Sequence, residues 1–341
     1  VKAPKIYFKD DVYIWANTSK HFNSTGKINI TGSEILELKN TDITMVNDQT
    51  NNEHPVIELN GGQITLDNSS ISQGDYYGWM NRFGFIYSSN PTQLTGNKIT
   101  EIKATGSFKL VNKSKLSMGT GNVFVNAKDV IMQDSVILNK NIWSAAKKGV
   151  GGIEMIAEND MILTNADITS STISSEIRAN IVLKGKQLNS VNAEVKIHDE
   201  RKGKAGSIQL DFEESVNMDK SQILSVGSSH LTRDTNGNTI TINSKDLNMK
   251  DSLINGIVEG DGKRGMTQLG VTGEISLDDS YVGGLEEPLE SIKFEAMITD
   301  GTLGAARNLG VGDEITVSSD LGEVRGRNLF HSFETLNIGS G

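Results

Sequence analysis

Pairs of apolar residues recur along the chain at fixed spacings, and each set of pairs predicts one turn of a coil of short strands. Within residues 56–72 the apolar positions follow steps of 2, 5, 2 and 5: Ile57, Leu59, Ile64, Leu66 and Ile71. A step of two places both side chains on one face of a β-strand, whereas a step of five requires a corner. The corners, residues 60–63 and 67–70, consist of Asn, Gly, Gln, Asp and Ser, most of which favour turns. The stretch therefore predicts three short strands with one apolar side.

The same spacing returns along most of the chain. Steps of 2, 5, 2 and 5 recur over residues 123–137 and 240–254, and steps of 2, 6, 2 and 5 occur over residues 28–43, 153–168 and 208–223. A looser copy covers residues 102–116, and a degenerate copy covers 181–195. The second corner carries a shared dipeptide: Asn40-Thr41, Asn68-Ser69, Asp134-Ser135, Asn165-Ala166 and Asp251-Ser252. We predict turns that begin at residues 28, 57, 102, 123, 153, 181, 208 and 240, preceded by one or two irregular turns.

Stacking of these turns predicts the architecture. One turn of three short strands cannot bury its apolar side alone, but turns stacked in register close a core and pair each backbone with the next. We therefore predict an all-β protein with a parallel β-helix over residues 1–296, in which Tyr13, Trp15 and Phe22 seal an edge. A β-propeller is the alternative. It needs blades of about 40 residues with antiparallel strands, and steps of five suit it less well.

Residues 73–100 interrupt the repeat with the most aromatic segment of the chain. Repeat proteins carry such insertions as loops on one face, and this is often the binding face. The segment is predicted either to pack on the flank of the helix or to form a contact loop with the side chains of Tyr76, Tyr77, Trp79, Phe83 and Phe85.

Composition and charge narrow the possible partners. The 341 residues include 35 Gly and only 4 Pro, which suits short strands with frequent turns, and the net charge is −10. Binding to nucleic acid or to an anionic membrane needs a basic surface, so we expect neither. No apolar run is long enough for a membrane-spanning helix of about 18 residues. The absence of Cys excludes disulfides and thiolate metal sites. Because Val1 is not a start methionine, we expect the chain to be processed or an excerpt.

The end of the chain resembles a known family. Residues 298–304 read Ile-Thr-Asp-Gly-Thr-Leu-Gly, residues 328–333 read Asn-Leu-Phe-His-Ser-Phe, and Asn337 follows. These motifs, together with the repeats, resemble filamentous-haemagglutinin-like passengers of two-partner secretion and their haemagglutination-activity secretion domain. The resemblance implies a right-handed parallel β-helix, an outer-membrane transporter as partner, and an extracellular location at the surface of a Gram-negative-type bacterium. Family members are adhesins, haemolysins, contact-dependent toxins or surface filaments.

The position of the motif departs from the family. There it follows the signal peptide, whereas here it lies in residues 297–341, and the Asn-Pro-x-Gly turn of the family is absent. An excerpt, a permutation, a join of two pieces, and a subunit whose tail serves a neighbour all fit this order. In the last case the strand-rich tail adds strands to the next subunit and builds a head-to-tail filament. The predicted assembly or secretion residues are Asn328, Leu329, Phe330, Ser332, Phe333 and Asn337.

The residues offer little for catalysis. The five histidines are scattered without metal-binding spacing. The acidic pairs Asp10-Asp11, Asp278-Asp279 and Glu286-Glu287 are interpreted as solvated corners, although a carbohydrate-active β-helix enzyme would use such carboxylates. Asn40, Asn68 and Asn165 are either stacked amides inside the helix or turn formers. We expect a structural or adhesive protein with no catalytic residue, cofactor or metal; a polysaccharide lyase or hydrolase is the alternative.

Overall fold

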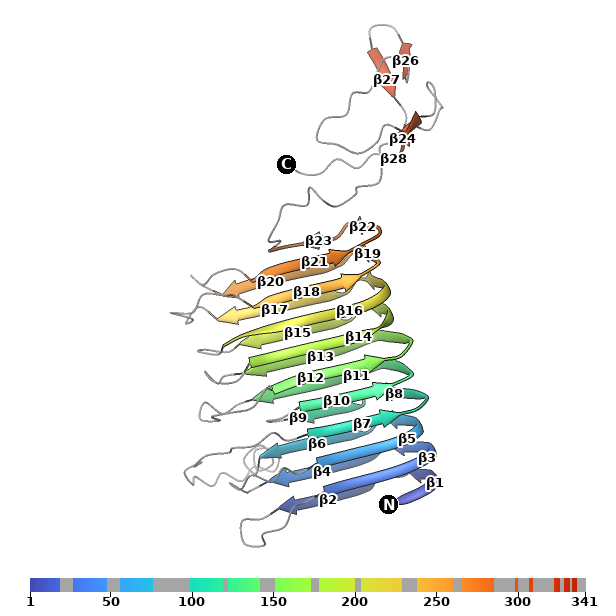
Figure 1. The fold of residues 1–341 in the computed structure, drawn as a ribbon, viewed down its shortest axis with the longest axis vertical. Coiled ribbons are helices and arrows are strands. Elements are labelled where there is room, and N and C mark those ends of the chain that lie inside the picture. Colours follow the sequence, from blue (N-terminus) through green and yellow to red (C-terminus); the bar gives the residue numbers. More distant parts are fainter. Residues whose placement is uncertain are drawn as a thin grey trace.

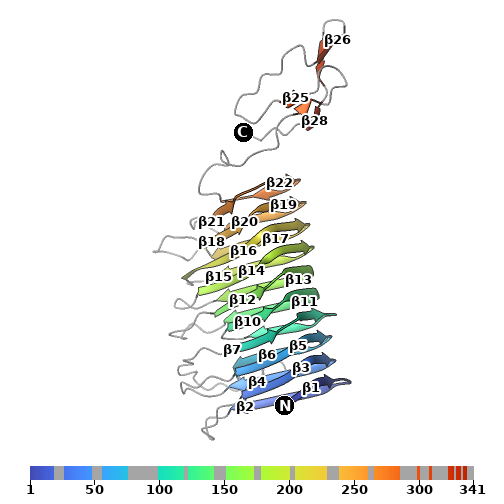
Figure 2. The ribbon, with the colours of Figure 1, turned by 45° about the vertical axis from the view of Figure 1, so that its right-hand side comes forward.

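The strands of this chain stack in parallel into one continuous ladder (Figure 1). The computed structural model describes residues 1–18, 27–47, 56–75, 99–118, 122–141, 151–172, 178–199, 204–228, 238–259 and 265–284, and five short strands between residues 298 and 335. The predicted all-β parallel β-helix is confirmed, and a view turned by 45° shows the same stacking along the long axis (Figure 2).

Three sets of strands build the turns. The first strands of the turns lie in β3 (Lys27–Lys39), β5 (Val56–Asp67), β7 (Ile99–Ala104), β10 (Asn122–Ala127), β12 (Gly151–Ala157), β14 (Arg178–Val191), β16 (Lys204–Asp219), β18 (Thr239–Ser244) and β21 (Met266–Val271). Four of these, β3, β5, β14 and β16, continue into the second strand of their turn. β1 (Lys2–Phe8) is a second strand, because Ile6 pairs with Leu36. Separate second strands are β8 (Ser107–Val111), β19 (Asp246–Lys250) and β22 (Ile275–Asp278). β11 (Asp129–Asn141) and β13 (Asp160–Thr172) each contain the second and the third strand of their turn. Separate third strands are β2 (Val12–Thr18), β4 (Thr41–Asn47), β6 (Ser70–Asp75), β9 (Lys115–Met118), β15 (Glu194–Asp199), β17 (Gln222–Ser228), β20 (Leu253–Glu259) and β23 (Tyr281–Val282).

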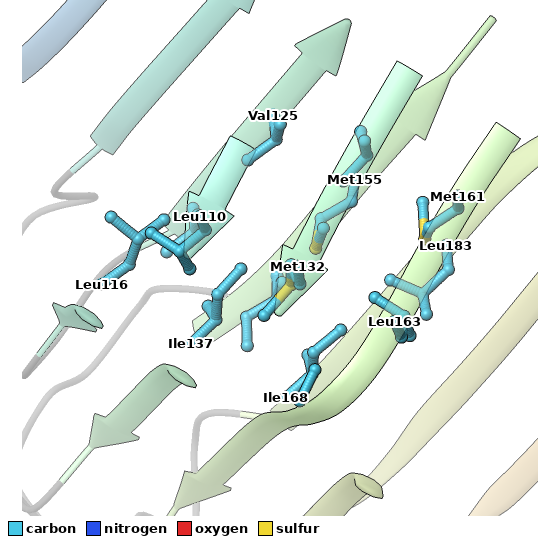
Figure 3. Packing of buried hydrophobic residues seen from close by; sticks show 14 of the residues in the cluster. Leu110, Leu116, Val125, Met132, Ile137, Met155, Met161, Leu163, Ile168 and Leu183 are labelled. Carbon is cyan, nitrogen blue, oxygen red and sulfur yellow. The ribbon is translucent and has the colours of Figure 1, made fainter. Parts of the chain in front are cut away.

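The core consists of columns of equivalent apolar residues. One column is formed by direct register partners in successive turns, all of them buried: Leu59, Ile102, Val125, Met155, Leu183, Leu210 and Ile242. Figure 3 shows part of this interior, where side chains from neighbouring turns meet. Full burial of one such side chain contributes about 1.5–3 kcal/mol, so the interior holds successive turns in register.

Several core positions hold polar residues, and three of these change the predicted frame. Thr100, not Ile102, is the register partner of Ile57, so that turn begins two residues earlier than predicted. The Thr100 hydroxyl meets Met118 Sδ at 3.1 Å inside the core. Ser190 occupies the fourth position of the turn that the sequence made look degenerate. An additional turn over residues 266–282 has Thr267 in its first position. A pattern of hydrophobic residues alone cannot identify these three positions, because polar residues occupy them.

At the edges of the repeat region, one expectation is met and one differs in detail. Residues 2–18 form the second and third strands of one irregular turn, in which Ile6 pairs with Leu36 and Ile14 with Ile43, within the predicted one or two irregular turns. The predicted insertion over residues 73–100 is shorter, because β6 extends to Asp75 and β7 begins at Ile99.

The tail is strand-rich, as predicted, but its strands are antiparallel. β24 (Ile298–Thr299) pairs with β25 (Arg307–Asn308) and with β28 (Phe333–Thr335). β26 (Gly322–Arg325) pairs with β27 (Asn328–His331). These two small sheets are separate from the ladder of the β-helix.

Candidate functional site

The second corner of each turn uses a left-handed backbone conformation. The φ angle lies between 45° and 50° at Asn40, Asn68, Asp134, Asn165, Asn192, Lys220, Asp251 and Asp279. Asn and Asp tolerate this conformation better than most residues. The shared Asn/Asp dipeptide of the sequence is thus explained by backbone geometry.

The amides of this corner lie on the outside of the helix, so the alternative of an amide ladder in the interior is wrong. Asn68 Nδ2 donates to Asn40 Oδ1 at 2.8 Å, and Asn165 Nδ2 donates to Asp134 Oδ1 at 2.8 Å, both at exposed positions. At the left-handed residue the side chain points outward, and the small residue that follows it points inward. A second outer ladder joins Asn189, Asn217 and Asn248, with amide contacts of 2.9 Å.

At most left-handed corners the next residue is Ser or Thr, and these residues form a ladder of hydroxyls on the inner side of the corner that Ala166 and Ala193 interrupt. Thr41 N–H donates to Ser69 Oγ at 3.0 Å, and Ser69 N–H donates to Ser114 Oγ at 3.0 Å. Towards the other end, the corresponding distance is 3.1 Å from Ser221 N–H to Ser252 Oγ and 3.0 Å from Ser252 N–H to Ser280 Oγ. The hydroxyls of five residues therefore accept a backbone N–H that would otherwise lack a partner: Ser69, Ser114, Ser221, Ser252 and Ser280.

Exposed aromatic rings gather in the first turn. Tyr7 is 47%, Tyr13 74% and Trp15 56% exposed, and Tyr281 in the last strand of the ladder is 58% exposed. Tyr13 and Trp15 lie two residues apart on the outer side of β2, so the prediction that these two rings seal an edge of the helix is wrong. The period-two pattern of β2 could have shown this, because Ile14 between them faces the core. Phe22, the third residue of that prediction, lies outside the described residues.

The two ends of the ladder leave apolar side chains incompletely covered. Ala3, Phe8, Ile14 and Ala16 at one end, and Leu269, Val271, Ile275 and Leu277 at the other, pack against the core but are only partly buried. Among the described strands, β1 and β2 pair with the ladder on one side only, and so do β21, β22 and β23. Both ends therefore present sheet edges beside apolar side chains.

The predicted assembly or secretion residues fall in the tail. Asn328, Leu329 and Phe330 belong to β27, and Phe333 pairs with Thr299 across β28 and β24. Ser332 and Asn337 lie outside the described residues, as do all five aromatic residues of the predicted contact loop, Tyr76, Tyr77, Trp79, Phe83 and Phe85. The structure thus places half of the motif on a hairpin, and the role of these residues stays a prediction.

The candidate acids do not form one cluster. Asp10 and Asp11 form the left-handed corner between β1 and β2, whereas Asp278 and Asp279 lie at the last described corner, at the opposite end of the ladder. Glu286 and Glu287 lie outside the described residues. Within the described ranges no group of three His, Asp or Glu residues is arranged to hold a metal ion. Among the same residues no helix is long and apolar enough to span a membrane.

Comparison with known proteins gives no relative. No family model matches the chain, and no curated protein or solved structure matches it either. The resemblance to filamentous-haemagglutinin-like proteins therefore rests on the sequence motifs alone.

Proposed function

We propose that this chain is an extracellular structural and adhesive protein without enzymatic activity, of the two-partner-secretion type. The observation that carries the proposal is the continuous stack of core columns, to which hydroxyl and amide contacts between successive turns are added at many corners. Such contacts make a stiff rod that holds its ends apart, and this suits a spacer at a bacterial surface.

The positions at which successive turns are connected are compatible with adhesive segments along one edge of the rod. Each described third strand ends at the same edge of the helix from which the next first strand begins, as at Asn47 and Val56, or at Asp75 and Ile99. The described strand ends that flank the connecting segments therefore share one edge of the helix. In our proposal these segments provide adhesive contacts, and the rod sets their spacing.

We further propose head-to-tail assembly, supported by the two ends of the ladder. Ile6 and Ile275 occupy the same core column, and so do Phe8 and Leu277. Placing the last turn of one copy against the first turn of the next would continue these columns and pair the free strand edges. Such a heterologous contact generates a filament. The tail, residues 297–341, is the proposed joining element.

Negative-stain microscopy with light scattering on the same sample tests the proposal. Long fibres of uniform width are expected, and deletion of residues 297–341 should abolish them. Leu277→Glu places a charge in the proposed joint, while Ser276→Glu places the same charge on the outer side of the same strand. Loss of fibres in L277E but not in S276E supports stacking of the ends. Single short rods at high concentration would overturn head-to-tail assembly.

A further inference from the structure

The outer side of β2 carries two exposed aromatic rings. Tyr13 is 74% and Trp15 is 56% exposed, so neither ring is buried in the core. Because alternate residues of a strand rise about 6.6 Å apart, the two rings stand side by side on one face. The equivalent positions of the next three turns hold no aromatic residue: Asp42 and Thr44, Ser70 and Ser72, and Lys115 and Ser117.

The surface beside these rings consists of short polar side chains on β4 and β6. Asp42 and Thr44 on β4 are the register partners of Tyr13 and Trp15, and Ser70 and Ser72 on β6 follow them. Thr44 Oγ1 lies 3.0 Å from Ser72 Oγ, and the Ser70 hydroxyl donates to the Asp42 carboxylate. Successive strands are about 4.8 Å apart. The face therefore continues from an aromatic platform into rows of hydroxyl and carboxylate groups along the helix axis.

The chemistry of this face selects among possible partners. A protein partner fits this face less well. The centre of a protein interface is apolar and poor in charge, which agrees with the two rings but not with the polar surface that contains Asp42. A nucleic acid or an anionic membrane needs a basic surface, whereas the chain carries a net charge of −10. A sugar chain matches both parts, because its C–H faces pack on aromatic rings and its hydroxyls pair with Asp, Ser and Thr.

We infer that the outer face of β2, β4 and β6 binds a neutral glycan, with Tyr13 and Trp15 as the platform and with Asp42, Thr44 and Ser72 as hydrogen-bonding partners. The inference rests on the proposed adhesive function and gives it a ligand class. The rings contact the apolar faces of the sugars, and the glycan extends along the helix axis across successive turns. Binding involves no bond cleavage.

Affinity electrophoresis in gels that contain soluble neutral polysaccharides tests the inference. Hydroxyethyl cellulose, a mixed-linkage β-glucan and a galactomannan serve as probes, and an acidic polysaccharide serves for comparison. The wild-type chain should be retarded by at least one neutral glycan. Trp15→Ala and Tyr13→Ala should each weaken binding about tenfold, as expected for an aromatic anchor. Trp15→Phe, which keeps a ring, should retain most of the binding.

Tyr281→Ala is the matched control, because Tyr281 is exposed on the outer face of β23 at the other end of the ladder. Far-UV circular dichroism checks that each variant folds. Absence of retardation by every neutral glycan, or equal loss in Y281A and W15A, would overturn the inference while leaving a rod-like spacer intact. Release of reducing ends from a bound glycan would instead overturn the proposed non-enzymatic role.

Discussion

The hydroxyl ladder can be tested at Ser221, a buried residue in the corner between β16 and β17. Its Oγ accepts a hydrogen bond from Ala193 N–H at 3.2 Å and donates to Asp219 O at 3.0 Å. Ser221→Ala removes both contacts and leaves the buried Ala193 N–H without its acceptor. A lost hydrogen bond costs about 0.5–1.5 kcal/mol, and an orphaned buried donor costs about 1–3 kcal/mol. Because these costs overlap, we expect a loss of about 2 kcal/mol in the free energy of unfolding.

Urea denaturation followed by circular dichroism measures the global effect. With a dependence of about 3 kcal/mol per molar urea, a loss of 2 kcal/mol lowers the midpoint by roughly 0.7 M. Because a repeat protein can open locally, hydrogen exchange at Ala193 gives a second readout, and its rate should rise about thirtyfold. Ser276→Ala, on the outer face of β22, is the control and should change stability by less than about 0.5 kcal/mol.

The reciprocal change is Ala166→Ser, in a turn where the ladder lacks a hydroxyl. Ala166 is the register partner of Ser135, and its position matches that of Ser221. The new hydroxyl can accept Ser135 N–H and donate to the Thr164 carbonyl, which should stabilise the protein by up to about 1 kcal/mol. If S221A unfolds at the wild-type midpoint and its residue 193 exchanges at the wild-type rate, the hydroxyl ladder does not stabilise the helix.

Three further substitutions examine other contacts between turns. Gly206→Ala would place Cβ 2.0 Å from the Ala179 carbonyl oxygen and should lower stability by about 1–3 kcal/mol in a urea titration; wild-type stability would contradict the close approach. Lys220→Gly removes the strain of a side chain on a left-handed backbone with φ 50°. It should raise the thermal midpoint, with a gain of up to about 1 kcal/mol in the free energy of unfolding. Asn217→Ala removes the middle of the outer amide ladder and should cost about 1 kcal/mol, more than Asn248→Ala at its end; equal costs would show that the amides act independently.

The sequence predicts only part of the candidate surfaces. The motif around Phe330 could be read directly, because a resemblance needs only residue order. The order of residues marks Trp15 as an aromatic residue near the end of the repeats, but only the pairing of β2 with β4 shows that its ring faces outward. The partial exposure of Leu277 cannot be predicted from the sequence, because it depends on which strands lie beside β22.

The spacing of apolar residues is enough to predict the period of the fold. Steps of two and five residues set the faces of the strands and the places of the corners, because backbone geometry links spacing to side-chain direction. Which residue of one turn lies on which residue of the next is known only from the pairing of the strands. The tertiary structure puts Thr100 in a core column and turns the Asn68 amide outward, because register is fixed by stacking between residues far apart in the chain. Local periodicity cannot carry that information.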